Sequence, residues 1–363
     1  MQMRQPSGSL KEGLLALRCR QLALSGKGGG SVQGLAVVVT GPGRVAVREV
    51  VIPEPTPGDV VVRVQHSWIS NGTERSVILG ERAGGEVPWR TGDPSPFPQV
   101  PGYQKVGMAT WVGEQVEGVR PGDMVFASTS RVEGMVRPAG GHVSPAVTPG
   151  SQVWRLPASV SAVAASGLVL AQVGYNAGTR APVAAGDNAL VVGDGLVGLW
   201  TAQVLAARGA RVLLAGRHDE RLGLAARVIP HVVRIDAGRQ ELRAAVRAAA
   251  PTGVRVLVDT VGSVETVMTL LDLLVRDSHV VSVGFCGSRG AIDIQRLRTR
   301  EVTLHCPSGW TRPRVAATLE AIREGSLRTE ELVTHRFPVH QAEAAYALVL
   351  ARRAEAVGVL LDW

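Results

Sequence analysis

The hydrophobic positions of the chain follow two different patterns. From about residue 34 to 165, short runs rich in β-branched residues, such as those at 35–40, 60–66 and 106–113, alternate with turns that contain Gly and Pro. Short strands separated by such turns are typical of an all-β barrel or meander, and helical periodicity is scarce in this part of the chain. We therefore predict that the first part of the chain forms a β-rich unit.

A second pattern begins near residue 170 and continues to about 306, where a strand and then a helix recur. The strands are almost continuously apolar, as in 188–192 and 254–259, and amphipathic helices separate them. This combination predicts a parallel sheet with helices on both faces. The end of the chain returns to a mixed pattern, with a helix near 314–325 and a closing strand near 356–362. The simplest account is a β-rich fold interrupted by an α/β insert.

Composition restricts the class of protein. Of the 363 residues, 45% are hydrophobic and 19% are charged, which excludes a disordered or fibrous chain and is sufficient for two globular domains. The cysteines Cys19, Cys286 and Cys306 lie far apart without a CxxC pair, which excludes a disulfide framework and a thiolate zinc cluster. No run of about 18 apolar residues is present. A soluble protein in a reducing, cytoplasmic setting is expected.

The formal net charge is +8, but half of the excess lies in residues 1–33, which contain five basic residues and one acidic residue. That segment ends in GKGGGS, a composition typical of flexible linkers, so we interpret residues 1–33 as a flexible N-terminal extension. The other basic residues are interspersed with acidic ones and form no basic stripe with aromatic residues between them. We expect neither a nucleic-acid partner nor a membrane partner.

A glycine-rich turn stands between a predicted strand and a predicted helix. It has the spacing GxGxxG, formed by Gly193, Gly195 and Gly198, with Leu196 and Val197 between the last two. In this context the first glycine permits a tight turn, the second lets the backbone approach a pyrophosphate, and the third lets the helix pack against the strand. The N–H groups at the helix N-terminus favour an anion. We predict a dinucleotide site here; a glycine turn without a ligand is the alternative.

The end of the following strand separates an NAD site from an NADP site. An NAD site usually has an acidic residue there, about 20 residues after the glycines, which binds the ribose 2′-hydroxyl. Here Gly216 ends the predicted strand, and Arg217 and His218 follow it. Without a carboxylate a 2′-phosphate is not repelled, and a guanidinium can bind it through two hydrogen bonds. These residues predict NADP(H), whereas the nearby Asp219 argues for NAD.

Several short motifs, taken in order from about residue 35 to the C-terminus, resemble those of the medium-chain dehydrogenase/reductase superfamily. They are PTPGDVVVRVQ, ISNGTE, VPGYQKVG, VRPGDMVF, GYNA, VVGDGLVG, LVDTVG, VVSVG and THRFPVHQAEAAYALV. The resemblance implies an α/β plus β fold: a GroES-like β-rich catalytic barrel at 34–168, an inserted Rossmann domain with a doubly wound parallel sheet at 169–306, and a return segment at 307–363 that completes the catalytic domain. Substrate would bind between the two domains.

The zinc-dependent members of this superfamily carry metal ligands where this chain has other residues. The resemblance implies that those members have a cysteine where this chain has Asn71, a histidine where it has Tyr103, a glutamate where it has Gln104, and a third ligand close to the position of Val169. Valine has no donor atom, and carboxamides and phenols bind Zn²⁺ poorly beside thiolate and imidazole. No pair of histidines has the i, i+4 spacing of a substitute site. We therefore expect no metal.

Without zinc, hydrogen-bond donors must stabilise the charge that develops on a substrate oxygen. Tyr103 is the leading candidate, because a phenol with a pKa of about 10 can donate a hydrogen bond or a proton at neutral pH. The amides of Asn71 and Gln104 would be neutral donors beside it, and Thr73 matches a position that carries a proton-relay hydroxyl in the zinc-dependent members. In the alternative, Tyr103 only packs, with its hydroxyl bonded to a backbone group.

Three further positions have two interpretations each. Asp259 and Gly262 match the loop that lies along the nicotinamide in the superfamily, but the end of a strand would explain both residues without a ligand. Glu74 could orient Tyr103 or Arg75, or it could cap a short helix, which is the commoner role.

The resemblance implies an oxidoreductase that transfers hydride with NADP(H). Two substrate classes fit: a C=C conjugated to a carbonyl, as in quinone oxidoreductases and enoyl reductases that lack zinc, and a ketone or alcohol centre. For the second class, GTE and PGY are similar to motifs of bacteriochlorophyllide a hydroxyethyl dehydrogenases, which would have an acid where this chain has Gln104. A nucleotide-binding redox sensor without turnover is a further alternative.

Aromatic residues could line an apolar pocket for a bulky or aromatic small-molecule substrate. Trp89 and Phe97 lie in the loop between two active-site motifs, and Trp68 and Trp310 could join them. The resemblance also implies a homo-oligomer, either a dimer or a tetramer, joined through the apolar strand near 302–306.

Overall fold

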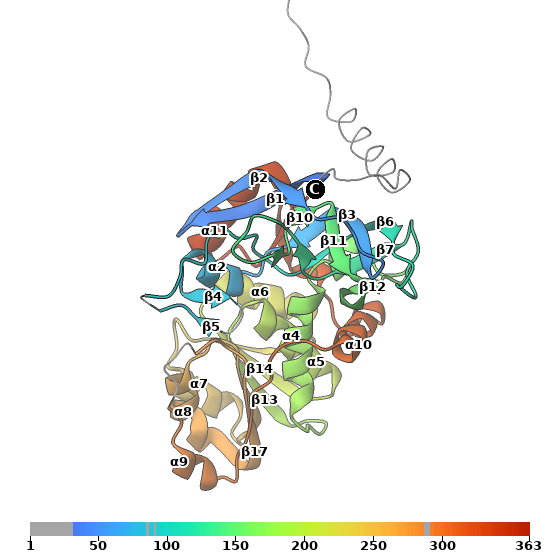
Figure 1. Cartoon of the computed structure of the whole chain (residues 1–363). Coiled ribbons are helices and arrows are strands. Elements are labelled where there is room, and N and C mark those ends of the chain that lie inside the picture. Colours follow the sequence, from blue (N-terminus) through green and yellow to red (C-terminus); the bar gives the residue numbers. More distant parts are fainter. Residues whose placement is uncertain (1–31, 85–86, 91, 287–290) are drawn as a thin grey trace, which may run out of the picture.

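The computed structural model covers the chain after its N-terminal segment (Figure 1). The described residues are 32–84, 87–90, 92–286 and 291–363. The predicted flexible extension, residues 1–33, lies outside them except for Val32 and Gln33, which are the first two residues of a strand.

The first part of the chain is rich in strands, as its hydrophobic pattern predicts. One sheet has the strand order β10-β1-β2, and a larger sheet follows the path β12-β7-β6-β3-β11-β8-β9. Valine dominates the buried positions, because β-branched side chains fit the pleated surface of a strand. The elements are β1 (Val32–Gly41), β2 (Arg44–Ile52), β3 (Asp59–Trp68), α2 (Thr73–Ile78), β4 (Arg82–Gly84), β5 (Val87–Pro88), β6 (Lys105–Val112), β7 (Met124–Ala127), β8 (Ser130–Arg131), β9 (Ala139–Gly140), β10 (Val143–Ser144), β11 (Ala146–Pro149), η1 (Gly150–Gln152), β12 (Val153–Arg155) and α3 (Ala162–Ala165).

The second part forms the predicted parallel sheet. Its strand order is β15-β14-β13-β16-β17-β18. Successive strands are added on one side of β13 and then, from β16, on the other side, so the carboxyl ends of the parallel strands β13 and β16 meet at a switch point. Ligands of open α/β sheets bind at such a point. The elements are α4 (Leu168–Arg180), β13 (Asn188–Val192), α5 (Leu196–Ala207), β14 (Arg211–Gly216), α6 (Asp219–Val228), β15 (Val233–Asp236), α7 (Leu242–Ala249), β16 (Val254–Asp259), α8 (Val264–Leu270), η2 (Leu271–Leu273), β17 (Leu274–Ser282), α9 (Ile294–Arg298) and β18 (Thr303–His305).

The end of the chain returns to the β-rich unit. Its closing strand β20 pairs antiparallel with β3, with Leu360 opposite Trp68 and Asp362 opposite His66. In Figure 1 the β-rich unit lies above the parallel sheet, and α11 lies beside β2. The elements are α10 (Arg312–Arg323), η3 (Glu330–Leu332), β19 (Val333–Pro338), η4 (Val339–Gln341), α11 (Ala342–Leu350) and β20 (Gly358–Asp362). The fold is therefore a β-rich unit with an inserted Rossmann-like sheet. The limits of the inserted domain, residues 169 and 306, stay a prediction.

Trp68, at the end of β3, joins the two units. Its indole is fully buried and meets Trp200 of α5, with ring centroids 5.8 Å apart in an edge-on arrangement. Gly167 and Gly358 leave room for the Trp68 ring, because a Cβ on either would stand within 2.9 Å of it. Trp68 therefore belongs to the core between the units, and the prediction that it lines a substrate pocket is wrong.

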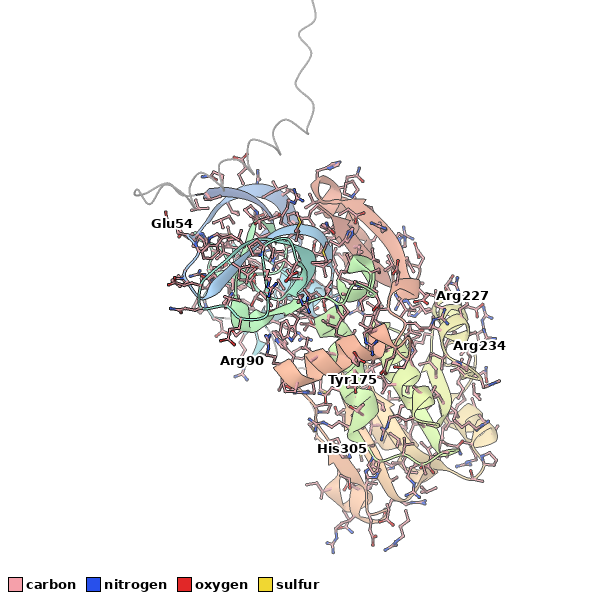
Figure 2. All side chains as sticks on the ribbon, turned by 90° about the vertical axis from the view of Figure 1, so that its right-hand side faces the viewer. Glu54, Arg90, Tyr175, Arg227, Arg234 and His305 are labelled. Atoms are coloured by element: carbon pink, nitrogen blue, oxygen red, sulfur yellow. The ribbon has the colours of Figure 1, made fainter. Side chains whose placement is uncertain are left out.

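The parallel-sheet unit carries exposed arginines at its edge. Figure 2 shows α10 lying across α4, with Tyr175 below it and Arg227 and Arg234 at the edge of the parallel-sheet unit. Both arginines are exposed. Among the residues that the structure describes, every helix is too short or too polar to span a bilayer.

Lys105 is an unusual buried charge in β6. Its side chain is fully buried, and its amine donates a hydrogen bond to the carbonyl oxygen of Ser128 at 2.5 Å. It forms no ion pair with any residue that the structure describes. Burial penalises the charged form and lowers the pKa of Lys105 to about 7.

Replacing Lys105 by Met is expected to raise the free energy of unfolding at pH 7, because Met fills a similar volume without a desolvated amine. The unfolded chain takes up the lysine proton near the ordinary pKa of 10.5 and the folded chain near 7. Between these values the unfolded state binds more protons, so wild-type stability should rise with pH by on the order of 4 kcal/mol. Urea denaturation at several pH values between 7 and 10 measures this rise, which the variant should lack.

Arg63→Met, which removes an exposed cation from the neighbouring strand β3, is the matched control and should keep the wild-type pH dependence. A wild-type free energy of unfolding that stays constant between pH 7 and pH 10 would contradict a neutral Lys105.

Candidate functional site

The glycine-rich turn connects β13 to α5 and leaves open space at the start of the helix. Gly193 has a backbone φ of 116°, which residues with a side chain rarely adopt. A Cβ on Gly198 would stand 1.9 Å from the carbonyl oxygen of Gly193, so only glycine lets the helix begin this close to the turn. Gly195 is the N-cap of α5, and no atom lies within 4 Å of the place where its Cβ would be. This space suits a phosphate group.

The side chains of Leu196 and Val197 pack into the protein and do not face the predicted cofactor site. Leu196 is buried in the core and Val197 is half-buried against it. No side chain caps the N-terminus of α5, so the first N–H groups of the helix remain available to a ligand. These two residues can therefore contribute to a nucleotide site through the backbone and not through their side chains.

The end of β14 lies beside this turn. Gly216 is the last residue of β14, Arg217 is exposed and His218 is half-exposed. The backbone N–H groups of Arg217 and His218 donate hydrogen bonds to Oδ2 of Asp194, in the glycine turn, at 2.8 and 2.9 Å. The structure thus brings the residues predicted to select the cofactor next to the residues predicted to bind its phosphates.

Asp259, at the end of β16, serves the loop that follows it. The residue is buried, and its carboxylate accepts hydrogen bonds from the N–H groups of Val261, Gly262 and Ser263 at 2.9 to 3.2 Å. Gly262 has a φ of 86°, and a Cβ on it would stand 2.4 Å from the carbonyl oxygen of Phe285. The oxygen atoms of Asp259 are thus used within the loop, so this residue shapes the segment that the resemblance places along the nicotinamide.

The hydroxyl of Tyr103 is held by a second hydroxyl. Its Oη donates to Oγ of Ser70 at 2.7 Å, so its partner is a side chain and not a backbone group. Burial raises the pKa of Tyr103 to about 12, and hydrogen bonding with Ser70 and then with Thr73 acts in the opposite direction. The ring stacks on Trp310, with centroids 5.9 Å apart. Tyr103 is therefore a protonated donor well above neutral pH.

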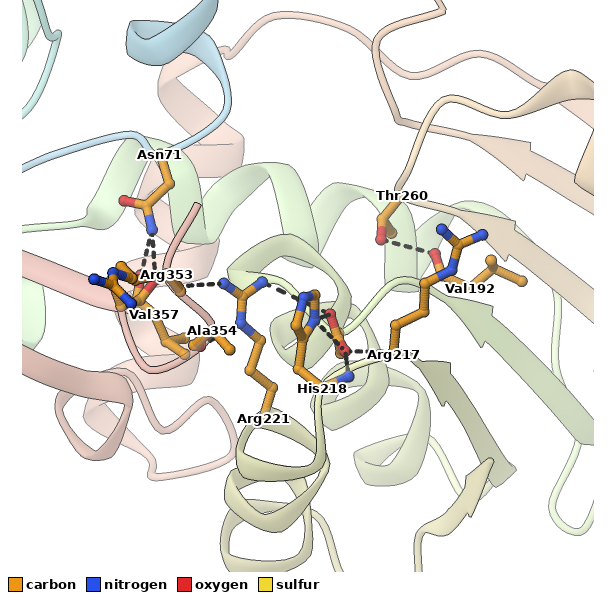
Figure 3. Close-up of polar contacts among 11 residues, drawn as sticks. Asn71, Val192, Arg217, His218, Arg221, Thr260, Arg353, Ala354 and Val357 are labelled. Atoms are coloured by element: carbon orange, nitrogen blue, oxygen red, sulfur yellow. Dashed lines mark hydrogen bonds and ion pairs between the residues drawn. The ribbon is translucent and has the colours of Figure 1, made fainter. Parts of the chain in front are cut away.

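Asn71 is bonded to the return segment. Its Nδ2 donates to the carbonyl oxygens of Ala356 and Val357 at 3.0 and 2.9 Å (Figure 3). The prediction of Asn71 as a donor to substrate is corrected, because these carbonyls use both of its N–H groups. Its Oδ1 is buried and has no hydrogen-bond partner among the described residues. Asn71 offers an acceptor, which a hydroxyl or an amide N–H of a ligand would satisfy.

Gln104 is fully buried and occupied at both ends. Its Nε2 donates to the carbonyl oxygen of Trp68 at 3.2 Å, and its Oε1 accepts from the N–H of Leu170 at 3.0 Å. The Leu170 N–H is one of the donors left unpaired in the first turn of α4. Gln104 therefore ties β3 to α4, and the prediction that it donates beside Tyr103 is corrected.

The residues at the zinc-ligand positions do not fit a metal ion. Val169 is buried in the core of α4, and the carboxamides of Asn71 and Gln104 are bonded to the backbone. Among the described parts of the chain, no group of three or more His, Cys, Asp or Glu residues is arranged to hold a metal ion.

Glu74 bonds to the residues around Tyr103. Its carboxylate is buried and accepts a hydrogen bond from the N–H of Ser70 at 2.7 Å and another from the Tyr346 hydroxyl. Its second oxygen lies 3.0 Å from Nε2 of His142. No side chain caps α2, and Glu74 bonds instead to the N–H of Ser70, the residue whose hydroxyl accepts from Tyr103.

Sequence reasoning missed Ser70, His142 and Arg82 as neighbours of Tyr103. Arg82 is buried in β4, and its guanidinium carbon lies 3.4 Å from the centroid of the Phe285 ring, in the loop after β17. Its charge lowers the pKa of Tyr103. Ser70 lies inside the ISNGTE motif and could have been found there, but no local signal marks the other two.

The predicted aromatic pocket is not assembled as expected. The Trp89 indole N–H donates to the carbonyl oxygen of Pro94 within its own loop, and Phe97 packs against the core beneath β1 and α11. Trp310 does reach the site, where one face of its ring covers Tyr103 and the residue remains 39% exposed.

Comparison with known proteins gives consistent matches. A family described as zinc-binding dehydrogenase matches residues 197–323. The chain is 27% identical over 343 residues to 2-desacetyl-2-hydroxyethyl bacteriochlorophyllide A dehydrogenase of Cereibacter sphaeroides, covering 90% of this chain and 98% of that protein. It is 26% identical to L-idonate 5-dehydrogenase of Vitis vinifera, covering 94% and 97%.

Solved structures share the fold. A zinc-binding dehydrogenase from Sinorhizobium meliloti 1021 bound to NADP superposes with a TM-score of 0.77 at 22% identity, covering 91% of this chain and 99% of that one. The inserted parallel sheet, the glycine turn at its switch point and the return of β20 to β3 agree with these matches. The family match, the relatives and the shared fold all support the resemblance of this chain to the medium-chain dehydrogenase/reductase superfamily.

Proposed function

We propose that the chain is a zinc-independent, NADP(H)-dependent oxidoreductase that transfers hydride to or from a ketone or alcohol centre, or to a C=C conjugated to a carbonyl. The observation that carries the proposal is the Tyr103 hydroxyl, which Ser70 holds. The sequence resemblance assigns this residue to the position of a histidine ligand in the zinc-dependent members. The bonded amides of Asn71 and Gln104 support the absence of zinc from the reaction, because neither has the donor chemistry of a zinc ligand.

The cofactor would lie along the carboxyl ends of β13 and β14. The N–H groups at the start of α5 would bind the pyrophosphate beside Gly195, and Arg217 and His218 would bind the 2′-phosphate. When bound, the nicotinamide supplies the hydride. The NADP in the Sinorhizobium meliloti structure supports this cofactor.

Tyr103 would move the proton that accompanies the hydride. In reduction of a carbonyl, the Tyr103 O–H turns to the substrate oxygen and gives it a proton, while Ser70 donates its own O–H to the Tyr103 oxygen. Thr73, at the start of α2, is the candidate for returning a proton to this pair. In oxidation of an alcohol the same proton moves in the opposite direction. The raised pKa of Tyr103 keeps the donor protonated throughout the neutral range.

The substrate is expected to be bulky or aromatic, because Trp310 presents an exposed ring next to Tyr103. The names of the two relatives specify dehydrogenases, one of them for a hydroxyethyl bacteriochlorophyllide, which favours an alcohol or ketone centre over a C=C. Gln104 replaces the acid expected in such hydroxyethyl dehydrogenases. Since Gln104 is bonded to Trp68 and Leu170, this replacement leaves the donor group of Tyr103 unchanged.

Two further proposals accompany this function. A homo-oligomer, dimer or tetramer, would form through β18, because that strand is the last in its sheet and Leu304 on it is exposed. A redox sensor is the alternative to an enzyme, and it would bind NADPH without turnover of any substrate.

Replacing Tyr103 by Phe is expected to lower turnover by about 10²- to 10⁴-fold, the usual contribution of a proton donor, and to leave NADPH binding unchanged. The measurement uses chelator-treated protein with NADPH and a panel of ketones, enones and, with NADP, alcohols. The wild-type rate should not decline near pH 10, because an ordinary tyrosine would ionise there and Tyr103 has a pKa of about 12.

Tyr175→Phe is the control, because it removes a phenol hydroxyl from α4 that bonds to no described residue. Loss of activity on chelation would show that a metal takes part. Full activity of Tyr103→Phe would exclude Tyr103 as the donor, and NADPH binding without turnover would favour the sensor.

Replacing Gly198 by Ala is expected to weaken NADPH binding by more than about tenfold, or about 1.4 kcal/mol, since the new Cβ would displace the Gly193 carbonyl and reshape the turn. Gly223→Ala in α6 is the matched control, because no atom lies within 4 Å of its Cβ position and the helix should gain stability. Fluorescence titration with NADPH distinguishes the two, and equal affinities in both variants would exclude this turn as the nucleotide site.

A further inference from the structure

Asp194 holds the end of β14 from the side of the glycine turn. It lies between Gly193 and Gly195 and is only 6% exposed. Its Oδ2 accepts hydrogen bonds from the backbone N–H groups of Arg217 and His218, at 2.8 and 2.9 Å. Nδ1 of His218 lies 3.0 Å from the same oxygen. One carboxylate therefore fixes the backbone of both residues and the imidazole of one.

The same side chain leaves no room for an acid at the end of β14. A Cβ on Gly216 would stand 2.4 Å from Oδ2 and 2.5 Å from Cβ of Asp194, and real Cβ atoms do not approach other atoms so closely. An acidic residue at this strand end is what binds the free ribose hydroxyl of NAD. Asp194 and a carboxylate at position 216 therefore exclude each other.

The negative charge of Asp194 is balanced by groups of the protein itself. Besides the two N–H groups and His218, Nη1 of Arg221 lies 3.7 Å from its Oδ1. Arg221 is held in place by hydrogen bonds to the carbonyl oxygens of Ala354 and Arg353, at 2.7 and 3.1 Å. These partners surround the carboxylate, so little of its charge would face a nucleotide.

Arg217 keeps its charge available. Its guanidinium makes no hydrogen bond or ion pair with any described residue, and the side chain is exposed. Figure 3 shows the side chains of Arg217 and His218 diverging from the turn. Since Nδ1 of His218 faces Asp194, its Nε2 is the ring nitrogen left for a ligand. The turn thus presents a guanidinium and an imidazole beside the phosphate-binding helix end.

We propose that Asp194 is a positioning residue that makes this site select the 2′-phosphate of NADP(H) over the free 2′-hydroxyl of NAD(H). It acts by excluding a carboxylate at position 216 and by fixing Arg217 and His218 at the end of β14. The proposal rests on the proposed NADP(H)-dependent function and adds the residue that sets the choice of cofactor.

The test is a set of binding constants for NADPH and NADH, measured by fluorescence titration on wild type, Asp194→Asn and Asp194→Ala. Asp194→Ala should weaken NADPH binding by about tenfold and change NADH binding by less than about twofold, because it releases the groups that face only the 2′-phosphate. Asp194→Asn keeps one carbonyl acceptor for the backbone N–H groups and should fall between wild type and Asp194→Ala.

A double variant tests the exclusion directly. Gly216→Asp alone should weaken the binding of both nucleotides, because its side chain meets Asp194. Gly216→Asp combined with Asp194→Ala should bind NADH more tightly than NADPH, since the new acid can then reach the ribose. Glu343→Gln is the control: this acid is exposed in the first turn of α11, in the return segment, and its replacement should leave the NADPH/NADH ratio unchanged.

The outcomes separate this proposal from the proposed function. Wild type that binds neither nucleotide overturns both. Wild type that prefers NADPH, with the same ratio in both Asp194 variants, overturns the role of Asp194 and leaves the function standing. An equal loss of both nucleotides in Asp194→Asn would show a merely structural role and also overturns the proposal.

Discussion

The position of Trp68 is the constraint on which the candidate site depends. Its indole fills the core between the units and meets Trp200, while its backbone pairs with β20 and its carbonyl oxygen accepts a hydrogen bond from Gln104. Packing on one side and hydrogen bonds on two others fix the end of β3. Ser70 and Asn71 lie two and three residues after Trp68, so the packing of this indole also helps to fix their positions.

The buried carboxylate of Glu74 holds Ser70, which in turn bonds to the Tyr103 hydroxyl. An ionised carboxyl group away from water needs hydrogen-bonding partners, and Glu74 has three, from Ser70, His142 and Tyr346. Burial, followed by the charge of Glu74, raises the pKa of Tyr346 well above its ordinary value, so Tyr346 remains a donor to it. Tyr346 stands 272 positions from Glu74 in the sequence, which explains why the return segment must fold back before the site is complete.

The sequence predicted those features whose cause is local. The parallel sheet follows from strand and helix periodicity, and the glycine turn follows from spacing, because Gly193 and Gly198 meet within six residues. The local sequence carries no signal for the groups to which an Asn or Gln amide will hydrogen-bond. The Asn71 amide is set by carbonyls 285 and 286 residues away and the Gln104 amide by an N–H 66 residues away, so both were assigned to the wrong partner.

The same contacts would also support the proposed zinc-independent function. A zinc ion would tie elements of the site together through its ligands, and here ordinary contacts connect the corresponding residues: Asn71 to the segment before β20, Gln104 to α4, and Val169 to the core. Each contact satisfies a backbone group or fills space, so the elements stay in register without a ligand set. The hydroxyl of Tyr103 bonds to a side chain and to no backbone group among the described residues, and the proposed proton transfer depends on it.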